Sequence, residues 1–521
     1  MSHSEASTRQ PVGRPYTGRV LRVNLTDGRI EVEELDALFY RRYLGGWGTI
    51  AHYLLREVAP GTDPLGPDNR LVFATGVLTG LPLSGAARHA VGAKSPLTGA
   101  FGACEVGGFW GTELKRAGFD AIVAQGQAER PVYLWVHDGE AELRHARHLW
   151  GLKTKDCQER LQEELGDRRL RVAQIGPGGE NRVRYACIMN DLRDAAGRCG
   201  LGAVMGSKRL KAIAVRGSGK ITPADPQGIQ ELARWMAARV DELAHGYHTL
   251  GTGAIMPAMA LTGNLPVRNF RDFDFPAERI CPERIRDTIR IGMDGCFACA
   301  VRCKKVVQQE KPYPVDPAYG GPEYETLAAL GSNCGVDDLA VVAKANELCN
   351  AYTVDTISAG VTIAFAMECF ERGLLTREDT GGVELRFGNG EALLTMIEQI
   401  VHREGLGALL AEGVQRAAAA IGQGSEAFAM QVKGQEYPMH EPRLKRALAI
   451  GYATSPTGAD HCHSLHDLGL EKEGPALDRL KELGILEPLP LEDLGPDKVR
   501  AAWYHTLDQI AQNSAPCCLF V

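Results

Sequence analysis

Three closely spaced cysteines constrain the fold of this chain more than any other sequence feature. Cys296, Cys299 and Cys303 follow the spacing C-x2-C-x3-C. This spacing can place three thiolates around one face of an iron–sulfur cubane while the fourth ligand is remote in sequence. Structural zinc would favour a second close pair of ligands, whereas Cys517 and Cys518 are adjacent and supply one ligand more easily than two. We therefore predict a [4Fe–4S] cluster, with structural zinc or no metal as the alternatives.

The overall cysteine content favours a reducing compartment. The chain has 14 cysteines, and its polar residues 1–15 contain no apolar export signal. In such a chain, clustered cysteines are more often metal ligands than disulfides, so a cytoplasmic protein is expected. We expect the cysteines outside the two clusters to be small buried hydrophobes: Cys104, Cys157, Cys187, Cys199, Cys281, Cys334, Cys349, Cys369 and Cys462.

Composition argues against two classes of function. The formal net charge is −7, whereas a nucleic-acid-binding protein needs a basic face. The most apolar stretch, residues 71–87, is interrupted by glycines, threonines and Pro82, and a membrane span needs about 20 mostly apolar residues. Neither a nucleic acid nor a membrane is therefore an expected partner. The 60 glycines in 521 residues exceed the usual share of about 7%, which indicates a large ligand that the backbone approaches closely.

The first part of the chain is predicted to be β-rich. Residues 18–25 alternate between polar and apolar, Asp27-Gly28 is a turn signal, and residues 30–32 resume the strand, so a hairpin is expected. A helix is expected at residues 153–165. Further strands are expected at residues 71–74, 121–125, 132–136, 170–175 and 211–215.

The remainder is predicted to be mainly helical, so the fold class is α+β. Asp225-Pro226 suits a helix start. Helices are expected at residues 225–243, 338–351, 359–371, 391–404 and 408–420. The expected division is a flexible tail at 1–15, a β-rich domain at 16–221, a helical domain with the cysteine loop at 222–430, and a helical C-terminal domain at 431–521.

Two other patterns have competing interpretations. Gly176-Pro177-Gly178-Gly179 follows a predicted strand, but it lacks the G-x-G-x-x-G spacing of a dinucleotide site and no helix is expected after it. Glycine turns with Arg88, Lys94, Arg198 and Lys208 among them suit the phosphates of an organic cofactor, or they are ordinary turns with surface charges. Similarly, the basic residues Arg302, Lys304 and Lys305 form either a docking patch for an acidic electron carrier or a solvated face.

Several segments, taken together, resemble the tungsten-containing aldehyde:ferredoxin oxidoreductase family. They occur in the family's order and cover residues 16–520. The segments are AKSPLTG at 93–99, GGFWG at 107–111, AAGR at 195–198, GAVMGSK at 202–208, GPEYE at 321–325, DTIS at 355–358 and the cysteine loop. The resemblance implies a β-rich, pterin-binding N-terminal domain and two helical domains. It also implies tungsten or molybdenum held by two molybdopterins, Mg²⁺ between their phosphates, and a neighbouring [4Fe–4S] cluster.

The resemblance assigns roles to individual residues. Arg88 matches the arginine that links cluster and pterin, and Ala195 and Glu105 match the residues that hold the magnesium. Asn350 to Asp355 and Asn513 to Cys518 match the two pterin-binding segments, in which Cys518 becomes the fourth cluster ligand beside Cys517. The leading acid of each segment is asparagine here, and Thr353 and Pro516 replace glycines. The other cofactor-binding residues expected are Lys94, Gly197, Arg198 and His463.

Glu325 and His461 match the ionisable pair near the metal. Oxidation of an aldehyde to a carboxylate needs a base and an acid, and histidine has a suitable pKa range. The implied activity passes electrons through the cluster to ferredoxin. The alternatives are a catalytic subunit of a larger reductase complex, like class II benzoyl-CoA reductase, or a non-catalytic remnant. A homodimer or a heteromeric complex is possible. Since family members continue well past the last cluster cysteine, the final domain is expected to be short or incomplete.

Overall fold

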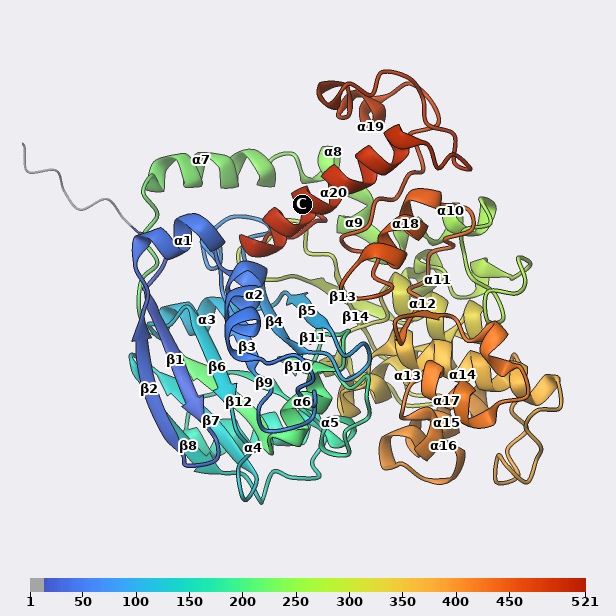
Figure 1. Ribbon diagram of the computed structural model, residues 1–521, viewed down its shortest axis with the longest axis horizontal. Coiled ribbons are helices and arrows are strands. Elements are labelled where there is room, and N and C mark those ends of the chain that lie inside the picture. Colours follow the sequence, from blue (N-terminus) through green and yellow to red (C-terminus); the bar gives the residue numbers. More distant parts are fainter. Residues whose placement is uncertain (1–13) are drawn as a thin grey trace, which may run out of the picture.

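The computed structural model describes residues 14–521. The flexible tail expected at residues 1–15 therefore falls almost wholly outside the described residues. A β-rich half and a helical half lie side by side, and the red helix α20 (Pro496–Ser514) runs across the top of the molecule in the view of Figure 1. The α+β fold class predicted from the sequence is confirmed.

The first sheet has the strand order β2-β1-β6-β3-β4-β5. Strands β1 and β2 form the expected antiparallel hairpin, in which Asn24 pairs with Arg29 across the turn. Gly28 adopts a φ of 73° there, which side chains other than glycine rarely tolerate. The strands span β1 Arg19–Asn24, β2 Arg29–Glu34, β3 Leu71–Ala74, β4 His89–Lys94, β5 Phe101–Val106 and β6 Ala121–Gln125.

The second sheet has the strand order β11-β10-β9-β12-β7-β8. Strand β12 lies between β7, to which it is parallel, and β9, to which it is antiparallel. Its residues Leu210 to Val215 are all buried, as expected for a central strand covered on both faces. The strands span β7 Val132–His137, β8 Glu140–His145, β9 Arg171–Gln174, β10 Ile188–Asn190, β11 Asp194–Ala196 and β12 Leu210–Arg216.

The two sheets pack face to face and are covered outside by helices. Leu21, Val23 and Phe73 of the first sheet share a core with Leu134 and Ile213 of the second, because alternate side chains of a strand point to the same face. Helix α2 (Gly46–Glu57) covers the other face of the first sheet. Helix α4 (Thr154–Leu165) covers the other face of the second sheet. Helices α1 Ala37–Tyr43, α3 Trp110–Arg116 and α6 Leu201–Ser207 complete this half.

The helical half is built around α14 (Thr356–Glu371). Every residue from Ile357 to Cys369 is buried, as expected of a helix that is apolar on all sides. Asp355 caps its start by accepting hydrogen bonds from the backbone N–H groups of Ile357 and Ser358. The neighbouring helices are α12 Tyr324–Leu330, α13 Leu339–Tyr352, α15 Gly390–His402, α16 Gly405–Leu410 and α17 Val414–Ile421.

Three sequence expectations about helices are corrected. The helix expected at residues 225–243 ends after α7 (Pro226–Ala237), and α8 (Val240–Leu243) is separate. The helix expected at 408–420 is divided between α16 and α17, because Gly413 has a φ of 87°. A short helix, α5 (Pro177–Glu180), does follow the strand before Gly176.

Smaller elements surround the cysteine loop and the C-terminal region. Strands β13 and β14 form the antiparallel ribbon that holds the loop. The smaller helices and strands of these two regions are α9 His245–Leu250, α10 Met256–Leu261, α11 Pro282–Thr288, β13 Arg290–Asp294, β14 Lys304–Val307, β15 Gln431–Val432, β16 Gln435–Glu436, α18 Arg446–Thr454 and α19 Pro475–Asp478. Short 3₁₀ helices span Thr252–Ile255, Ala277–Arg279, Pro317–Tyr319, Ser332–Cys334, Ser425–Phe428 and Lys481–Leu483.

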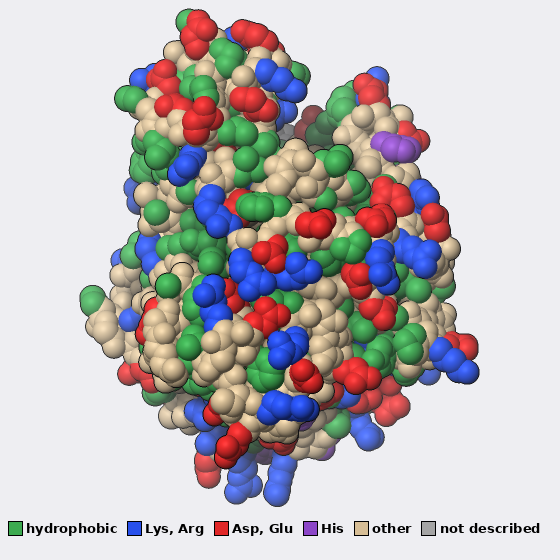
Figure 2. Space-filling view, turned by 90° about the vertical axis from the view of Figure 1, so that its right-hand side faces the viewer, with side chains coloured by type: hydrophobic (Ala, Val, Ile, Leu, Met, Phe, Trp, Pro, Cys, Tyr) green, Lys and Arg blue, Asp and Glu red, His purple; other side chains and the backbone are tan. Residues whose placement is uncertain are grey.

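A buried ion pair holds α20 to the segment that follows α18. Lys498 Nζ lies 2.8 Å from Asp467 Oδ2, and both side chains are wholly buried. Beyond this pair, the segment around α19 forms the taller of two projections that flank a hollow at the top of the molecule (Figure 2). Within residues 14–521, none of the helices combines the length and apolarity that a membrane crossing requires.

Candidate active site

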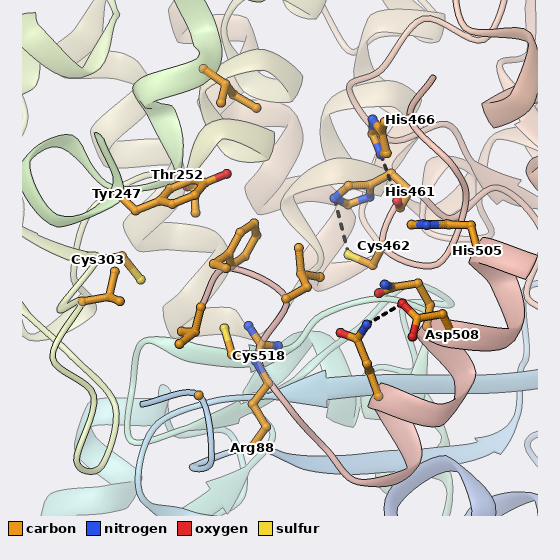
Figure 3. A pocket seen from close by; sticks show the side chains of 18 of the residues that line it. Arg88, Tyr247, Thr252, Cys303, His461, Cys462, His466, His505, Asp508 and Cys518 are labelled. Carbon is orange, nitrogen blue, oxygen red and sulfur yellow. Dashed lines mark hydrogen bonds between the residues drawn. The ribbon is translucent and has the colours of Figure 1, made fainter. Parts of the chain in front are cut away.

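Four cysteines line one wall of a large cavity between the two halves of the molecule. The β13–β14 ribbon presents Cys296, Cys299 and Cys303, and the segment after α20 brings Cys518 to the same cavity of about 1040 Å³ (Figure 3). The backbone N–H of Cys518 donates to the carbonyl of Gly85 at 3.0 Å, which fixes the segment against the β-rich half. The fourth cysteine is thereby brought close to the other three, as a four-cysteine cluster requires.

The cysteine loop is held by contacts with the β-rich half. The N–H of Phe297 donates to the carbonyl of Gly108 at 3.1 Å, and the N–H of Ala300 donates to Ser84 Oγ at 3.0 Å. A Cβ atom on Gly107 would lie 2.7 Å from Cys296 Sγ. Glycine at position 107 is therefore what allows this thiol to approach so closely.

Burial keeps two of the cavity thiols protonated. It raises the pKa of Cys296 to about 12 and that of Cys303 to about 11, with nearby acidic groups adding to both shifts and Lys304 opposing them. A thiol with a raised pKa loses its proton when a metal cation binds to the sulfur. Cys296 and Cys303 therefore suit a metal centre better than nucleophilic chemistry.

Arg88 lies beside the cysteines and pairs with no carboxylate within residues 14–521. Its guanidinium makes one long contact, 3.4 Å, to the carbonyl of Glu105. Although burial alone would lower it, the pKa of Arg88 is raised because Cys518, Cys296 and Glu105 are close. A partly buried cation that faces thiols and open space is suited to an anionic group.

A second cavity, of about 230 Å³, adjoins the first. The two cavities share Lys304, Glu323 and Glu325 in their walls. Ala195, Gly197, Arg198, Asn350 and Asp355, all predicted to bind the cofactor, line this second cavity.

The second cavity contains a buried ion pair and open space beside a glycine. Arg198 Nε lies 3.2 Å from Asp355 Oδ2, and both side chains are buried. A Cβ atom on Gly197 would meet no atom within 4 Å, so space lies beside this backbone. The cavity therefore offers both charged groups and accessible backbone to a polar ligand.

Five residues predicted to bind the cofactor line neither cavity: Glu105, His463, Asn513, Cys517 and Lys94. Asn513 is buried near the end of α20, and its Nδ2 has no hydrogen-bond partner among the described residues. The buried Oε1 of Glu105 is likewise unpaired there, and burial raises the pKa of this carboxyl to about 7. His463 is engaged within the protein, 3.2 Å from Asp460 and 2.8 Å from Ser455. Cys517 packs toward Gly85 rather than into the cavity.

Two predicted phosphate-binding lysines are placed elsewhere. Lys94 ends β4, the strand that follows Arg88. At about 3.3 Å per residue, the strand carries Lys94 roughly 20 Å from Arg88. Lys208 is fully buried and donates to the carbonyls of Pro67, Asn69 and Gly126. Lys208 therefore stabilises loops, and Lys94 lies outside both cavities.

The structure supports neither interpretation of the basic residues after the cysteine loop, a docking patch or a solvated face, for two of the three residues. Lys304 turns inward to Asp194 at 3.3 Å, and Lys305, 1% exposed, lies 3.2 Å from Glu323. Only Arg302 of the three is exposed. The carboxylates of Asp194, which is buried, and Glu323, which is half-buried, account for the difference, because a buried lysine needs a carboxylate partner.

The predicted pair Glu325 and His461 meets in the wall of the large cavity. His461 Nε2 lies 3.4 Å from Glu325 Oε1. Glu325 belongs to the first turn of α12, and its Oε2 accepts a hydrogen bond from the N–H of Met439 at 2.8 Å. The two side chains are therefore close to each other and face the cavity, as acid–base chemistry requires.

The structure adds residues that the sequence interpretation missed. His440 Nε2 lies 3.1 Å from the same oxygen of Glu325. Cys462, expected to be a buried structural cysteine, lines the cavity with Sγ 3.5 Å from His461 Nε2 (Figure 3). His466 also lines the cavity. The sequence signal for these residues was a local concentration of histidines, since four of the 14 histidines fall between residues 440 and 466.

The fold and the cavity wall place this protein among the enzymes that carry out oxidation and reduction. Residues 20–217 match the family described as aldehyde ferredoxin oxidoreductase, N-terminal domain, and residues 231–521 match aldehyde ferredoxin oxidoreductase, domains 2 and 3. The chain belongs to the aldehyde ferredoxin oxidoreductase family, and the enzyme is an oxidoreductase. Membership of this family implies a tungsten–pterin cofactor.

Individual relatives agree with the family assignment. The chain is 43% identical to the tungsten-containing aldehyde ferredoxin oxidoreductase of Pyrococcus abyssi, over 86% of this chain and 74% of the relative. It is 32% identical to the aliphatic sulfonate oxidoreductase, WOR-like subunit, of Pyrococcus furiosus, over 86% of this chain and 75% of the relative. Among solved structures, it resembles the active site complex BamBC of benzoyl coenzyme A reductase, with a TM-score of 0.77 and 31% identity, over 86% of this chain and 70% of that chain.

Proposed function

We propose that this enzyme oxidises an aldehyde to a carboxylate and passes the electrons through a [4Fe–4S] cluster to ferredoxin. The observation that supports this most is the shared wall of the two cavities, where Glu325 lies between the cysteine wall and the Arg198–Asp355 pair. The cavities fit a large anionic cofactor, since Arg88 has no carboxylate partner and Asn513 Nδ2 is unpaired.

The protein would hold its cofactors with distinct sets of residues. Cys296, Cys299, Cys303 and Cys518 would ligate the cluster, with Arg88 beside it. The tungsten (or molybdenum) bis-pterin would be held by Ala195, Gly197, Arg198, Asn350, Asp355 and Asn513, with Mg²⁺ near Ala195 and Glu105. The bound tungsten–pterin group supplies the two-electron redox chemistry.

Glu325 and His461 would manage protons at the reacting centre. Oxidation of an aldehyde by water yields a carboxylate, two electrons and three protons. Glu325 would accept a proton from the water that adds to the carbonyl carbon, and His461 would donate a hydrogen bond to the substrate oxygen. Their 3.4 Å approach lets one group compensate the charge that develops on the other.

Metal analysis and turnover together test the proposal. Anaerobically purified enzyme should contain about one tungsten or molybdenum and about four iron atoms per chain, as a mononuclear bis-pterin site and one cubane require. It should reduce a viologen dye when an aldehyde is supplied. Finding zinc alone would exclude the proposal, as would metal-replete enzyme that is inert toward short, branched and aromatic aldehydes.

A second candidate is a catalytic subunit of a larger reductase complex. The similarity to a benzoyl coenzyme A reductase complex supports it, as does an apolar stripe on α20, where Val499, Trp503 and Leu507 are 46%, 63% and 45% exposed. Large exposed apolar residues in a row are typical of protein contacts. Co-purification with a redox subunit, together with absence of aldehyde-dependent dye reduction, would favour this candidate over the first.

A further inference from the structure

We propose that His440, Lys445 and His466 form a relay that carries the proton from Glu325 away from the reacting centre. The inference rests on the proposed oxidation, which releases protons at Glu325. It assigns a function to Lys445 and His466, neither of which belongs to the pair that faces the substrate.

The relay is a continuous series of short polar contacts. Glu325 Oε1 lies 3.1 Å from His440 Nε2. The opposite ring nitrogen, His440 Nδ1, lies 3.1 Å from Lys445 Nζ. Lys445 Nζ in turn lies 3.0 Å from His466 Nδ1. The two contacts of Lys445 Nζ are hydrogen bonds. The Glu325–His440 contact has a hydrogen-bond distance but is not aligned as a hydrogen bond among the described residues, so this link needs a rotation of the imidazole or carboxylate before the proton moves.

The fold isolates this series from bulk water at its middle and opens it at its ends. Lys445, immediately before α18, is 1% exposed, and His440 is 5% exposed. Glu325 and His466 both line the large cavity. His440 lines the same cavity, so the buried Lys445 joins groups at two positions of one cavity wall.

The proton transfer balances without any further reactant. Glu325, protonated by the reaction, gives its proton to His440 Nε2 as His440 Nδ1–H passes to the neutral amine of Lys445. The products are the Glu325 carboxylate, a neutral His440 of the opposite tautomer, and the Lys445 ammonium. The ammonium then gives a proton to His466 Nδ1. His466 Nε2–H donates to the carbonyl of His461 at 3.0 Å, and its proton passes to cavity water as that bond opens.

The charges around Lys445 suit a group that gains and loses a proton. Burial lowers its pKa to about 7, although Asp467, Glu325 and Glu441 oppose the shift. Asp467 is already paired with Lys498 at 2.8 Å. Burial also lowers the pKa of His440 and of His466 well below the usual value, so both rings are neutral and transfer protons through their two nitrogens.

Enzyme kinetics provide the first test. The relay needs the Lys445 amine, so kcat of the wild type should rise as the pH increases through about 7. Lys445→Met should lower kcat by about 10-fold or more, within the range of lost proton transfer, leave KM and metal content unchanged, and remove the rise near pH 7. Lys433→Met is the matched control, because Lys433 bonds only to the carbonyl of Ser455.

Histidine tautomers provide a test that is independent of turnover. In holoenzyme with ¹⁵N-labelled histidine, His440 should carry its proton on Nε2 below about pH 7 and on Nδ1 above it, following Lys445. The switch should be absent in Lys445→Met. The wild-type enzyme could show the tautomer switch and yet oxidise no aldehyde. That result would support the relay and exclude an aldehyde as the substrate. Wild-type kcat and pH profile in Lys445→Met, or no tautomer switch in the wild type, would overturn the relay.

Discussion

Glu325 is fixed by neighbours that leave it able to accept a proton. One carboxylate oxygen accepts from the N–H of Met439 at 2.8 Å, and the other faces the imidazoles of His440 and His461 at 3.1 and 3.4 Å. The first turn of a helix further stabilises the carboxylate. Because its direct neighbours are imidazoles rather than lysine or arginine, the group is oriented without a permanent cation bound to it.

Removal of either member of the pair should therefore affect turnover rather than cofactor content. Glu325→Gln or His461→Ala should lower kcat by about 100-fold or more, the scale of lost acid–base catalysis. Tungsten and iron content should stay at the wild-type level. Steady-state dye reduction and elemental analysis check this. Turnover at the wild-type rate in both variants would remove the pair from the chemistry.

Sequence comparison located this pair but not its surroundings. Glu325 and His461 belong to motifs that could be recognised locally. His440 meets Glu325 only through the fold. Its neighbour Met439, which donates to Glu325, is 114 residues away from it in the sequence. Lys304 and Lys305 could be interpreted as a surface patch from the sequence, because their carboxylate partners, Asp194 and Glu323, lie in other segments of the chain. Long-range contacts of this kind leave no local pattern.

At the scale of elements, the cysteine ribbon depends on a glycine of the β-rich half. Gly107→Ala would place a Cβ atom 2.7 Å from Cys296 Sγ, closer than packed atoms tolerate. We expect this variant to lose most of its iron, measured per chain after anaerobic purification. Gly292→Ala, on the same ribbon with no atom within 4 Å of the new Cβ, should retain it. Equal iron in both variants would contradict the expectation.

The start of α14 should contribute to stability in two ways. Asp355→Ala removes a helix cap worth about 1 kcal/mol and leaves Arg198 buried without its partner, which costs about 3–5 kcal/mol. Asp338→Ala removes only the cap of α13, an exposed bond of 2.8 Å to the N–H of Ala340. Calorimetry should therefore show a much larger fall in melting temperature for Asp355→Ala. Similar falls would mean that the Arg198 contact is energetically minor.

Element positions were predictable where a strand or helix has one clear period. The strands at residues 71–74 and 121–125 were predicted with the bounds they have, because apolar runs between turn residues identify buried strands. The expected helix at 408–420 failed at Gly413, whose φ of 87° divides a pattern that is otherwise helical. The left-handed backbone conformation of a single residue depends on tertiary contacts, so hydrophobic periodicity does not predict it.

For the whole molecule, charge should govern the encounter with the ferredoxin that we propose as the electron acceptor. The protein has a net charge of −7, and two of the three basic residues near the cluster loop are paired with carboxylates. An acidic ferredoxin would therefore be repelled overall, and salt screens that repulsion within about 10 Å at 0.1 M. We expect its KM to fall as salt increases. A steep rise of KM with salt in steady-state assays would instead indicate a basic docking site.

The contact between Cys518 and Gly85 has a consequence for how the enzyme matures. Cys296, Cys299 and Cys303 belong to one segment and Cys518 to another, and Pro516 packs the second segment against Gly46 and Gly76. A nascent chain still on the ribosome cannot present this wall until residue 518 has emerged. Assembly of this wall therefore requires two segments more than 200 residues apart in sequence to be docked at the same time.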